Sequence, residues 1–199
     1  MQRSFFFSAG PWAVPGNYSV KLTANGKSVA QPLIVLRDPR SNASAEVLQQ
    51  QFALVSQLSE SLEQVSIALR QAKDLRKQID ERKKDAAAKR ELIASLDSFN
   101  QKMEIAAEPD SDNDFMLFGL ALPDKAREPL PRIQSALTGL LIIEQSADVA
   151  PSADAVTAAN AWNTSNNEAL ARWKTVLAQD LAAVNSKLRG ANLKPLGVN

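Results

Sequence analysis

The sequence predicts a mainly α-helical protein, an up-down four-helix bundle with two long and two short helices, preceded by a short β-hairpin. Three observations predict it. Apolar residues from Leu48 to Ile79 recur in nine steps of three or four positions, which is the seam of a long helix packed on other helices. A similar seam runs from Val156 to Leu188. The dipeptide Asn25-Gly26 lies between two strand-like stretches and is the strongest short signal for a two-residue hairpin turn.

The hairpin is predicted within residues 16–36. Tyr18, Val20 and Leu22 alternate with polar residues, as they do in a half-buried strand. The return stretch contains Pro32, which is typical of an edge strand or a bulge. Because two strands alone are marginally stable in water, we expect this hairpin to be the end of something larger.

Four helices follow, at about 44–84, 87–107, 130–146 and 153–189, so the sequence divides into a hairpin region (1–40) and a helical region (41–199). The first seam, continued by sevens, reaches Arg82 and Lys89, which are poor core residues, and a turn near 83–87 is therefore predicted. Ser41, Asn42 or Ser44 can cap the start of the first helix, and Pro129 or Pro131 suits the first turn of the third. Ser152 caps the start of the fourth helix, and Gly190 follows its end.

The predicted helix lengths suggest how the bundle is arranged. Two long helices would pair as a stalk, and two short ones would complete a four-helix section with up-down-up-down connections. In that arrangement the end of the last helix lies beside the start of the first one and beside the hairpin.

Composition restricts the chemistry. The chain of 199 residues has neither Cys nor His, which removes disulfides, thiol nucleophiles, Ser-His-Asp triads and the usual zinc sites. A net charge of +1 gives no support for a nucleic-acid partner. No apolar stretch is long enough to span a membrane, and the apolar part of 1–10, Phe5 to Phe7, is too short for a signal core; we interpret it as a remnant strand.

Several short motifs resemble a known family, namely Pro11-Trp12, Pro15-Gly16-Asn17-Tyr18-Ser19-Val20-Lys21-Leu22, the Asn25-Gly26-Lys27 turn, Gln31-Pro32-Leu33 and Asp38-Pro39-Arg40. They resemble the segment that closes an immunoglobulin-like module in large exported bacterial β-propeller proteins with BNR or sortilin-like repeats, which are glycosyl-hydrolase-like. The resemblance continues through three helical stretches, Leu48–Phe52, Leu75–Gln78 and Ala171–Leu188. In that family these positions belong to a C-terminal helical segment.

The resemblance implies that Tyr18 occupies the tyrosine corner of an Ig-like sandwich. It also implies an exported protein, in the periplasm or outside the cell, although the chain has no convincing signal peptide of its own. The propeller and most of the sandwich have no counterpart here, so no family active site can be carried over. We expect a non-catalytic structural or protein-interaction module without a cofactor. It would bind a protein partner or self-associate through the hairpin or through the apolar loop at Phe115 to Leu122. The alternative is a carbohydrate- or peptide-binding accessory module.

Possible binding residues are few. Trp12 and Tyr18 could stack on sugars, although the tyrosine corner explains Tyr18 without a ligand. The apolar run from Phe115 to Leu122, with Phe118, is either a plug folded onto the bundle or an exposed patch for a partner. Trp162 and Trp173 lie on the last seam and are interpreted as core residues rather than as a ligand platform.

Acidic residues offer one metal candidate. Asp110, Asp112 and Asp114 match the first three ligand positions of a calcium loop, but Phe115 replaces the required Gly and Ala121 the final Glu, so a solvated acidic loop is the favoured interpretation. Residues 70–90 carry nine basic and four acidic side chains, and 104–114 carry five acidic ones. These are either solvated surfaces or guides for an antiparallel or head-to-tail contact. No pair of carboxylates suggests the cleft that glycoside hydrolysis needs.

Overall fold

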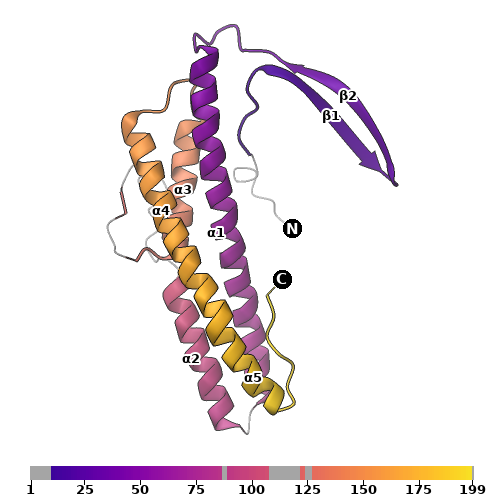
Figure 1. Ribbon diagram of the computed structural model, residues 1–199, viewed down its shortest axis with the longest axis vertical. Coiled ribbons are helices and arrows are strands. Elements are labelled where there is room, and N and C mark those ends of the chain that lie inside the picture. Colours follow the sequence, from indigo (N-terminus) through magenta and orange to yellow (C-terminus); the bar gives the residue numbers. More distant parts are fainter. Residues whose placement is uncertain (1–9, 87–88, 108–121, 124–126, 199) are drawn as a thin grey trace.

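The computed structural model describes residues 10–86, 89–107, 122–123 and 127–198, with only the backbone of 104–107. The elements in chain order are β1 (Gly16–Ala24), β2 (Lys27–Val35), α1 (Ala45–Asp85), α2 (Arg90–Ala107), α3 (Leu130–Glu144), α4 (Ala153–Thr175), η1 (Val176–Leu181) and α5 (Ala182–Gly190). The described chain is mainly helical, and a two-stranded antiparallel hairpin precedes the helices, as predicted (Figure 1).

Helix α1 is the longest element and runs the full height of the helical part (Figure 1). Its N-cap is Ser44, whose Oγ accepts a hydrogen bond from the Val47 N–H at 3.3 Å. Three basic residues occupy the last turn, where the helix dipole favours positive charge. The helix ends at Asp85 and α2 begins at Arg90, so the break lies where the seam meets residues unsuited to a core.

Helices α4, η1 and α5 form one continuous rod. Ser152 caps its start, because the Ser152 Oγ accepts from the Ala155 N–H at 3.1 Å. From Trp173 to Leu181 the buried face advances eight residues, whereas two α-helical turns need about seven. The π-helical turn η1 lies in this interval and absorbs the extra residue, so the buried face stays toward the other helices.

Hydrogen bonds between helices fix their directions. Ser61 contacts Asn163 (Oγ to Oδ1, 2.7 Å), and the Trp173 indole N–H donates to Gln71 Oε1 at 3.1 Å. Residue numbers therefore rise together along α1 and α4, which are parallel. Helices α2 and α3 both run the other way. Helix α2 follows α1 after a short turn, and its Asp97 pairs with Lys83 of α1. On α3, Gln134 donates to Ser66 of α1 at 2.9 Å and the later residue Glu144 accepts from the earlier Gln51.

The predicted up-down-up-down arrangement is thus wrong in its connections. Helices α2 and α3 lie one beyond the other along α1: at one end α1, α3 and α4 pack on one another, and at the other end α2 packs against both α1 and α5 (Figure 1). The end of α5 lies at the opposite end of α1 from the hairpin. The physical reason is length: at about 1.5 Å per residue, the 18 and 15 residues of α2 and α3 together span about 50 Å, close to the length of α1.

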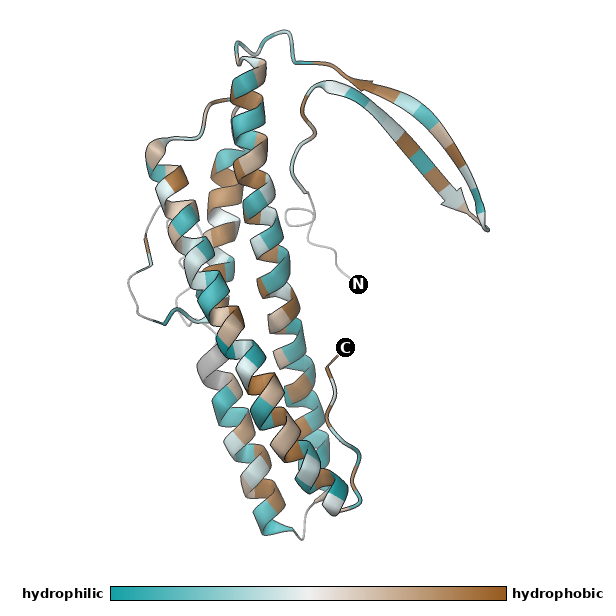
Figure 2. Cartoon of the chain, viewed as in Figure 1, coloured by the Kyte–Doolittle hydropathy of each residue, from teal (hydrophilic) through white to brown (hydrophobic). Residues whose placement is uncertain are grey.

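The core follows the two predicted seams for most of their length, but Val156, predicted as the first residue of the second seam, is 40% exposed, and Ala155 is buried instead. On α1, Leu54 and Ala68 are buried in addition to seam residues such as Leu58 and Val65, since α1 packs against helices on more than one side. Trp162 and Trp173 are almost fully buried, which confirms that they are core residues. Figure 2 shows the matching pattern, with polar residues along the outer faces of the helices.

Candidate functional site

Most large apolar side chains of the hairpin lie on one face; the other face is polar on β1 but carries Ile34 on β2. Asn25 and Gly26 have φ of 50° and 74°, the positive values that a type I′ turn requires. The register pairs Tyr18 with Leu33 and Leu22 with Val29. Because side chains alternate across a strand, one face gathers most of the large apolar residues around Gln31, which lies opposite Val20. We call it the apolar hairpin face, and its apolar members are Tyr18, Val20, Leu22, Val29, Leu33 and Val35.

The apolar hairpin face is uncovered. Leu22 is 70% exposed, Val29 is 61% exposed and Val20 is 53% exposed. Within the part of the chain that the structure describes, the strands pair with each other and extend away from the helices (Figure 1), apart from the half-buried Val35 at the end of β2, which lies near the start of α1. Large apolar side chains gathered on one exposed face are typical of a surface that another element covers.

The two edges of the hairpin differ. Pro32 has no N–H, and a proline in a strand is tolerated where that group would face away from the neighbouring strand. Its partner Ser19 therefore belongs to a pair without ladder hydrogen bonds, as does the Thr23–Ser28 pair, whose hydroxyl oxygens lie 2.8 Å apart. It follows that Ser19, Lys21 and Thr23 direct their backbone N–H and C=O groups to the outer edge of β1. That edge lacks a proline, whereas the outer edge of β2 is interrupted at Pro32.

Tyr18 and Trp12, both predicted as weak binding candidates, have different surroundings. The Tyr18 hydroxyl donates to the Val14 carbonyl at 2.6 Å, four residues upstream, and its ring lies on the apolar hairpin face. This bond matches the tyrosine-corner pattern of a hydroxyl bonded to upstream backbone. Trp12 is 67% exposed, and its backbone N–H donates to Gln145 Oε1 at 3.0 Å.

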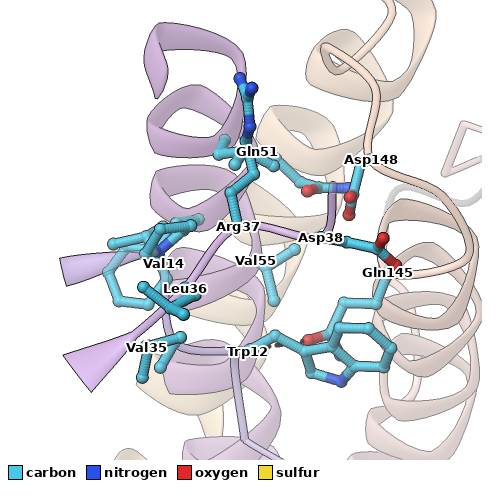
Figure 3. A pocket seen from close by; sticks show the side chains of 14 residues that line it. Trp12, Val14, Val35, Leu36, Arg37, Asp38, Gln51, Val55, Gln145 and Asp148 are labelled. Atoms are coloured by element: carbon cyan, nitrogen blue, oxygen red, sulfur yellow. Dashed lines mark hydrogen bonds between the residues drawn. The ribbon is translucent and has the colours of Figure 1, made fainter. Parts of the chain in front are cut away.

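Trp12 borders a hollow of about 230 Å³ at the base of the hairpin. Figure 3 shows its indole beside Gln145, with Asp38 and Asp148 further along the same wall. Apolar side chains of β2 and α1, including Val35 and Val55, line the rest. The hollow therefore brings together four segments: the approach to β1, the end of β2 with the linker after it, the start of α1, and the loop between α3 and α4.

Hydrogen bonds hold this hollow in place. Gln51 of α1 donates to the carbonyls of Glu144 and Ala147, which fastens the loop after α3 to α1. The Arg40 side chain lies 2.7 Å from Asp38, and together with the Arg40 backbone amide it holds the pKa of that carboxyl below its ordinary value. A lowered pKa is the reverse of what a carboxylic acid that donates a proton requires. The Asp38 carboxyl is therefore poorly suited to act as a proton donor.

One other carboxyl near this end has a shifted pKa. Glu144 is the last residue of α3, and its burial raises the pKa of its side chain above the ordinary value. Among the described residues, no three aspartates and glutamates gather in a way that could hold a metal ion. The calcium candidate Asp110, Asp112 and Asp114 and the apolar candidates Phe115 and Phe118 lie outside the described residues, and they stay predictions.

The residues that sequence reasoning missed are the polar lining of the hollow, chiefly Gln51, Gln145 and Asp148. They come from segments about one hundred residues apart, and each occupies an ordinary polar position of a helix or loop. No periodicity marks such residues, because only the packing of α3 against α1 brings them together.

Comparison with family models, with curated proteins and with solved structures finds no match to this chain. The resemblance to exported β-propeller proteins therefore stays a prediction. Among the described helices, none combines the length and apolarity needed to cross a membrane.

Proposed function

We propose that the chain is a non-catalytic structural and protein-interaction module, the C-terminal piece of a larger exported β-propeller protein in the periplasm or outside the cell. The β1–β2 hairpin is its interaction element. The observation that carries this proposal is the uncovered apolar hairpin face on an otherwise well-packed protein. The Tyr18–Val14 hydrogen bond supports the further idea that the hairpin derives from an Ig-like sandwich.

Burial of the apolar hairpin face would be the main source of favourable free energy on association. Fully burying a Val or Leu side chain contributes about 1.5–3 kcal/mol relative to leaving it exposed. Val20, Leu22 and Val29 are each more than half exposed, so a partner sheet that covers them has a substantial driving force. An isolated pair of strands has no comparable source of stability.

The backbone geometry of the hairpin then decides which of its two edges a partner strand can pair with. A partner strand can form a continuous hydrogen-bond ladder only beside β1, since Pro32 interrupts the other edge. This is strand addition, in which main-chain bonds supply affinity and alternate side chains supply selectivity. A second copy of the chain or a strand of the larger protein could each supply it.

Two matched proline substitutions test the proposal. Ser19 and Ala30 both lie in pairs without ladder hydrogen bonds, so S19P and A30P each leave the bonds within the hairpin intact. Sedimentation equilibrium over a wide concentration range measures self-association of the full chain. We expect association that S19P weakens at least tenfold and A30P leaves unchanged. Equal effects of the two variants, or a protein that is monomeric throughout, would remove support for self-association through the β1 edge.

The hollow at Trp12 favours one second candidate, a carbohydrate- or peptide-binding accessory module. An exposed indole beside amide and carboxylate groups is a surface on which a sugar ring can stack and hydrogen-bond. Because Trp162 and Trp173 are buried, a change in tryptophan fluorescence on adding ligand would report on Trp12. A glycan array on which the wild-type chain and W12A are equally silent would remove the carbohydrate ligand, and a peptide array with the same result would remove the peptide ligand.

A further inference from the structure

The apolar residues of α1 and α4 leave the direction of packing open. A seam of three- and four-residue steps has the same spacing when it is read from either end. A connection of 22 residues, such as the one between α2 and α3 (108–129), reaches up to about 3.3 Å per residue, well beyond the roughly 22 Å length of α3. The antiparallel packing of α4 on α1 that the sequence predicts is therefore a competing arrangement of the same chain.

Two polar contacts between α1 and α4 form together in one direction only. The Ser61 Oγ lies 2.7 Å from Asn163 Oδ1, and the Trp173 indole N–H donates to Gln71 Oε1 at 3.1 Å. Both contacts join residues 102 positions apart, so the second lies equally far along both helices from the first. In an antiparallel pair that kept the first contact, the partners of the second would lie about 30 Å apart. A slide of one heptad keeps the seams in contact but breaks both polar contacts.

Burial makes these contacts selective. Asn163 and Trp173 are buried, and the neighbouring Asn166, whose Nδ2 lies 3.4 Å from the Ser61 carbonyl, has no exposed surface. A buried polar group that loses its partner costs more free energy than the same group gains from a hydrogen bond that is made. The contacts therefore add little to the stability of the parallel arrangement and penalise the alternatives more strongly.

Asn166 indicates that this part of the interface does not have the most stabilising sequence. It lies on the second seam, with the apolar residues Trp162 and Leu170 four positions before and after it. Its Oδ1 makes no hydrogen bond within the part of the chain that the structure describes, and a leucine at this position would bury more apolar surface. In coiled coils, a buried asparagine on the seam selects one register at a cost in stability.

We propose that the buried polar residues between α1 and α4 form a conformational device, the directional lock, which selects the parallel packing of these helices over the antiparallel one. The lock consists of Ser61, Gln71, Asn163, Asn166 and Trp173. It also decides whether the hollow at Trp12 exists, because the parallel packing brings Gln145 and Asp148 to the start of α1. In the antiparallel packing their loop would lie at the other end of α1. The inference rests neither on the hairpin nor on a ligand in the hollow.

Spin labels on α1 and α4 can report the direction of packing. The chain has no Cys, so A53C and T157C place one label on an exposed position of each helix. In the parallel packing the two positions lie at nearly the same height. In an antiparallel packing of the two full-length rods they would be separated by about 40 Å along the axis. Double electron–electron resonance on the otherwise wild-type chain should therefore give one short distance.

The lock variant S61A/Q71L/N163L/N166L replaces the polar partners with apolar side chains and leaves the Trp173 indole N–H without its acceptor in either direction. We expect a second population, with a label separation of about 40 Å, beside the short distance. A folded lock variant that gives the short distance alone would overturn the proposal.

A control and a milder variant complete the test. N160L/N167L carries the same kind of substitution at two exposed positions of α4 and should give only the short distance; a second population there would contradict the proposal. N166L covers the case in which the lock variant does not fold. It leaves both contacts in place, so it should keep the short distance and melt roughly 2–4 °C above the wild type. A lower melting temperature would show that Asn166 serves stability, and would overturn the proposal.

Discussion

The two ends of the molecule differ in how their extended segments are held. At one end, β1 and β2 leave an apolar face and an open edge exposed, and of the described strand residues only Val35 lines a hollow shared with a helix. At the other end, segment 191–198 has the buried Leu196 in the core and two of its residues bonded at both N–H and C=O by side-chain amides. The comparison teaches that an extended segment is stable on this protein only where the helices supply a pocket and polar partners.

A matched pair of leucine substitutions should give the largest contrast. Leu58 lies fully buried in the core of α1, and Leu22 is mostly exposed on the hairpin. We expect L58A to lower the free energy of unfolding by about 2–5 kcal/mol, because it leaves a cavity. L22A should change that quantity by less than about 0.5 kcal/mol in the monomer, as an exposed residue does. Urea denaturation followed by circular dichroism measures both, and a cost for L22A close to that of L58A would show that the hairpin face is covered.

Asn185 and Gln78 each hold one backbone residue of segment 191–198 through two hydrogen bonds, and we call these two side chains the amide clamps. Removing one of them should have an intermediate effect on the free energy of unfolding. N185L deletes both hydrogen bonds to Leu196 and leaves two partly buried backbone groups without these partners. We expect a loss of about 1–3 kcal/mol in the free energy of unfolding. The control is N167L, at an exposed position of α4, which should have little effect. A clamp variant as stable as its control would mean that segment 191–198 is held by Leu196 alone.

The raised pKa of Glu144 predicts a small pH effect near the hairpin end. The folded state holds this proton more tightly than the unfolded state, so stability falls as pH rises from the ordinary pKa of a glutamate through the raised one. E144Q removes the titration, and we expect the variant to lose this part of the pH dependence and to be more stable than the wild type at neutral pH. Denaturation curves at several pH values test the sign. A stability difference between the two proteins that does not change with pH would contradict the assignment.

The smallest effect is expected from the surface ion pair between Lys83 and Asp97, which joins α1 to α2. Both side chains are partly exposed, and such pairs contribute about 0–1 kcal/mol. D97N should therefore destabilise the protein only slightly, and added salt should reduce the difference. A large loss that salt leaves unchanged would imply that this end of the bundle depends on the pair.

The seams explain why much of the fold could be predicted. Steps of three and four from Leu48 to Ile79 fix α1, and Asn25-Gly26 fixes the hairpin turn. Helix direction could not be predicted, because a seam has no polarity and the connection between α2 and α3 contains no signal that they run the same way. The roles of Gln78 and Asn185 could not be predicted either, because each is an ordinary polar residue on a helix and only the tertiary fold brings residues 191–198 beside it.

Hydrogen–deuterium exchange on the full chain, at a concentration where it is monomeric, tests the central claim most directly. The account holds that the helices form a complete hydrophobic core and that the hairpin is a sheet lacking a partner. The opening free energies of amides in the buried turns of α1 and α4 should then approach the free energy of global unfolding, whereas amides of β1 and β2 should exchange with little protection. Protection of the strands should then rise as the concentration increases and pairing sets in. Strand amides in the dilute monomer that are as protected as those of α1 would contradict the account.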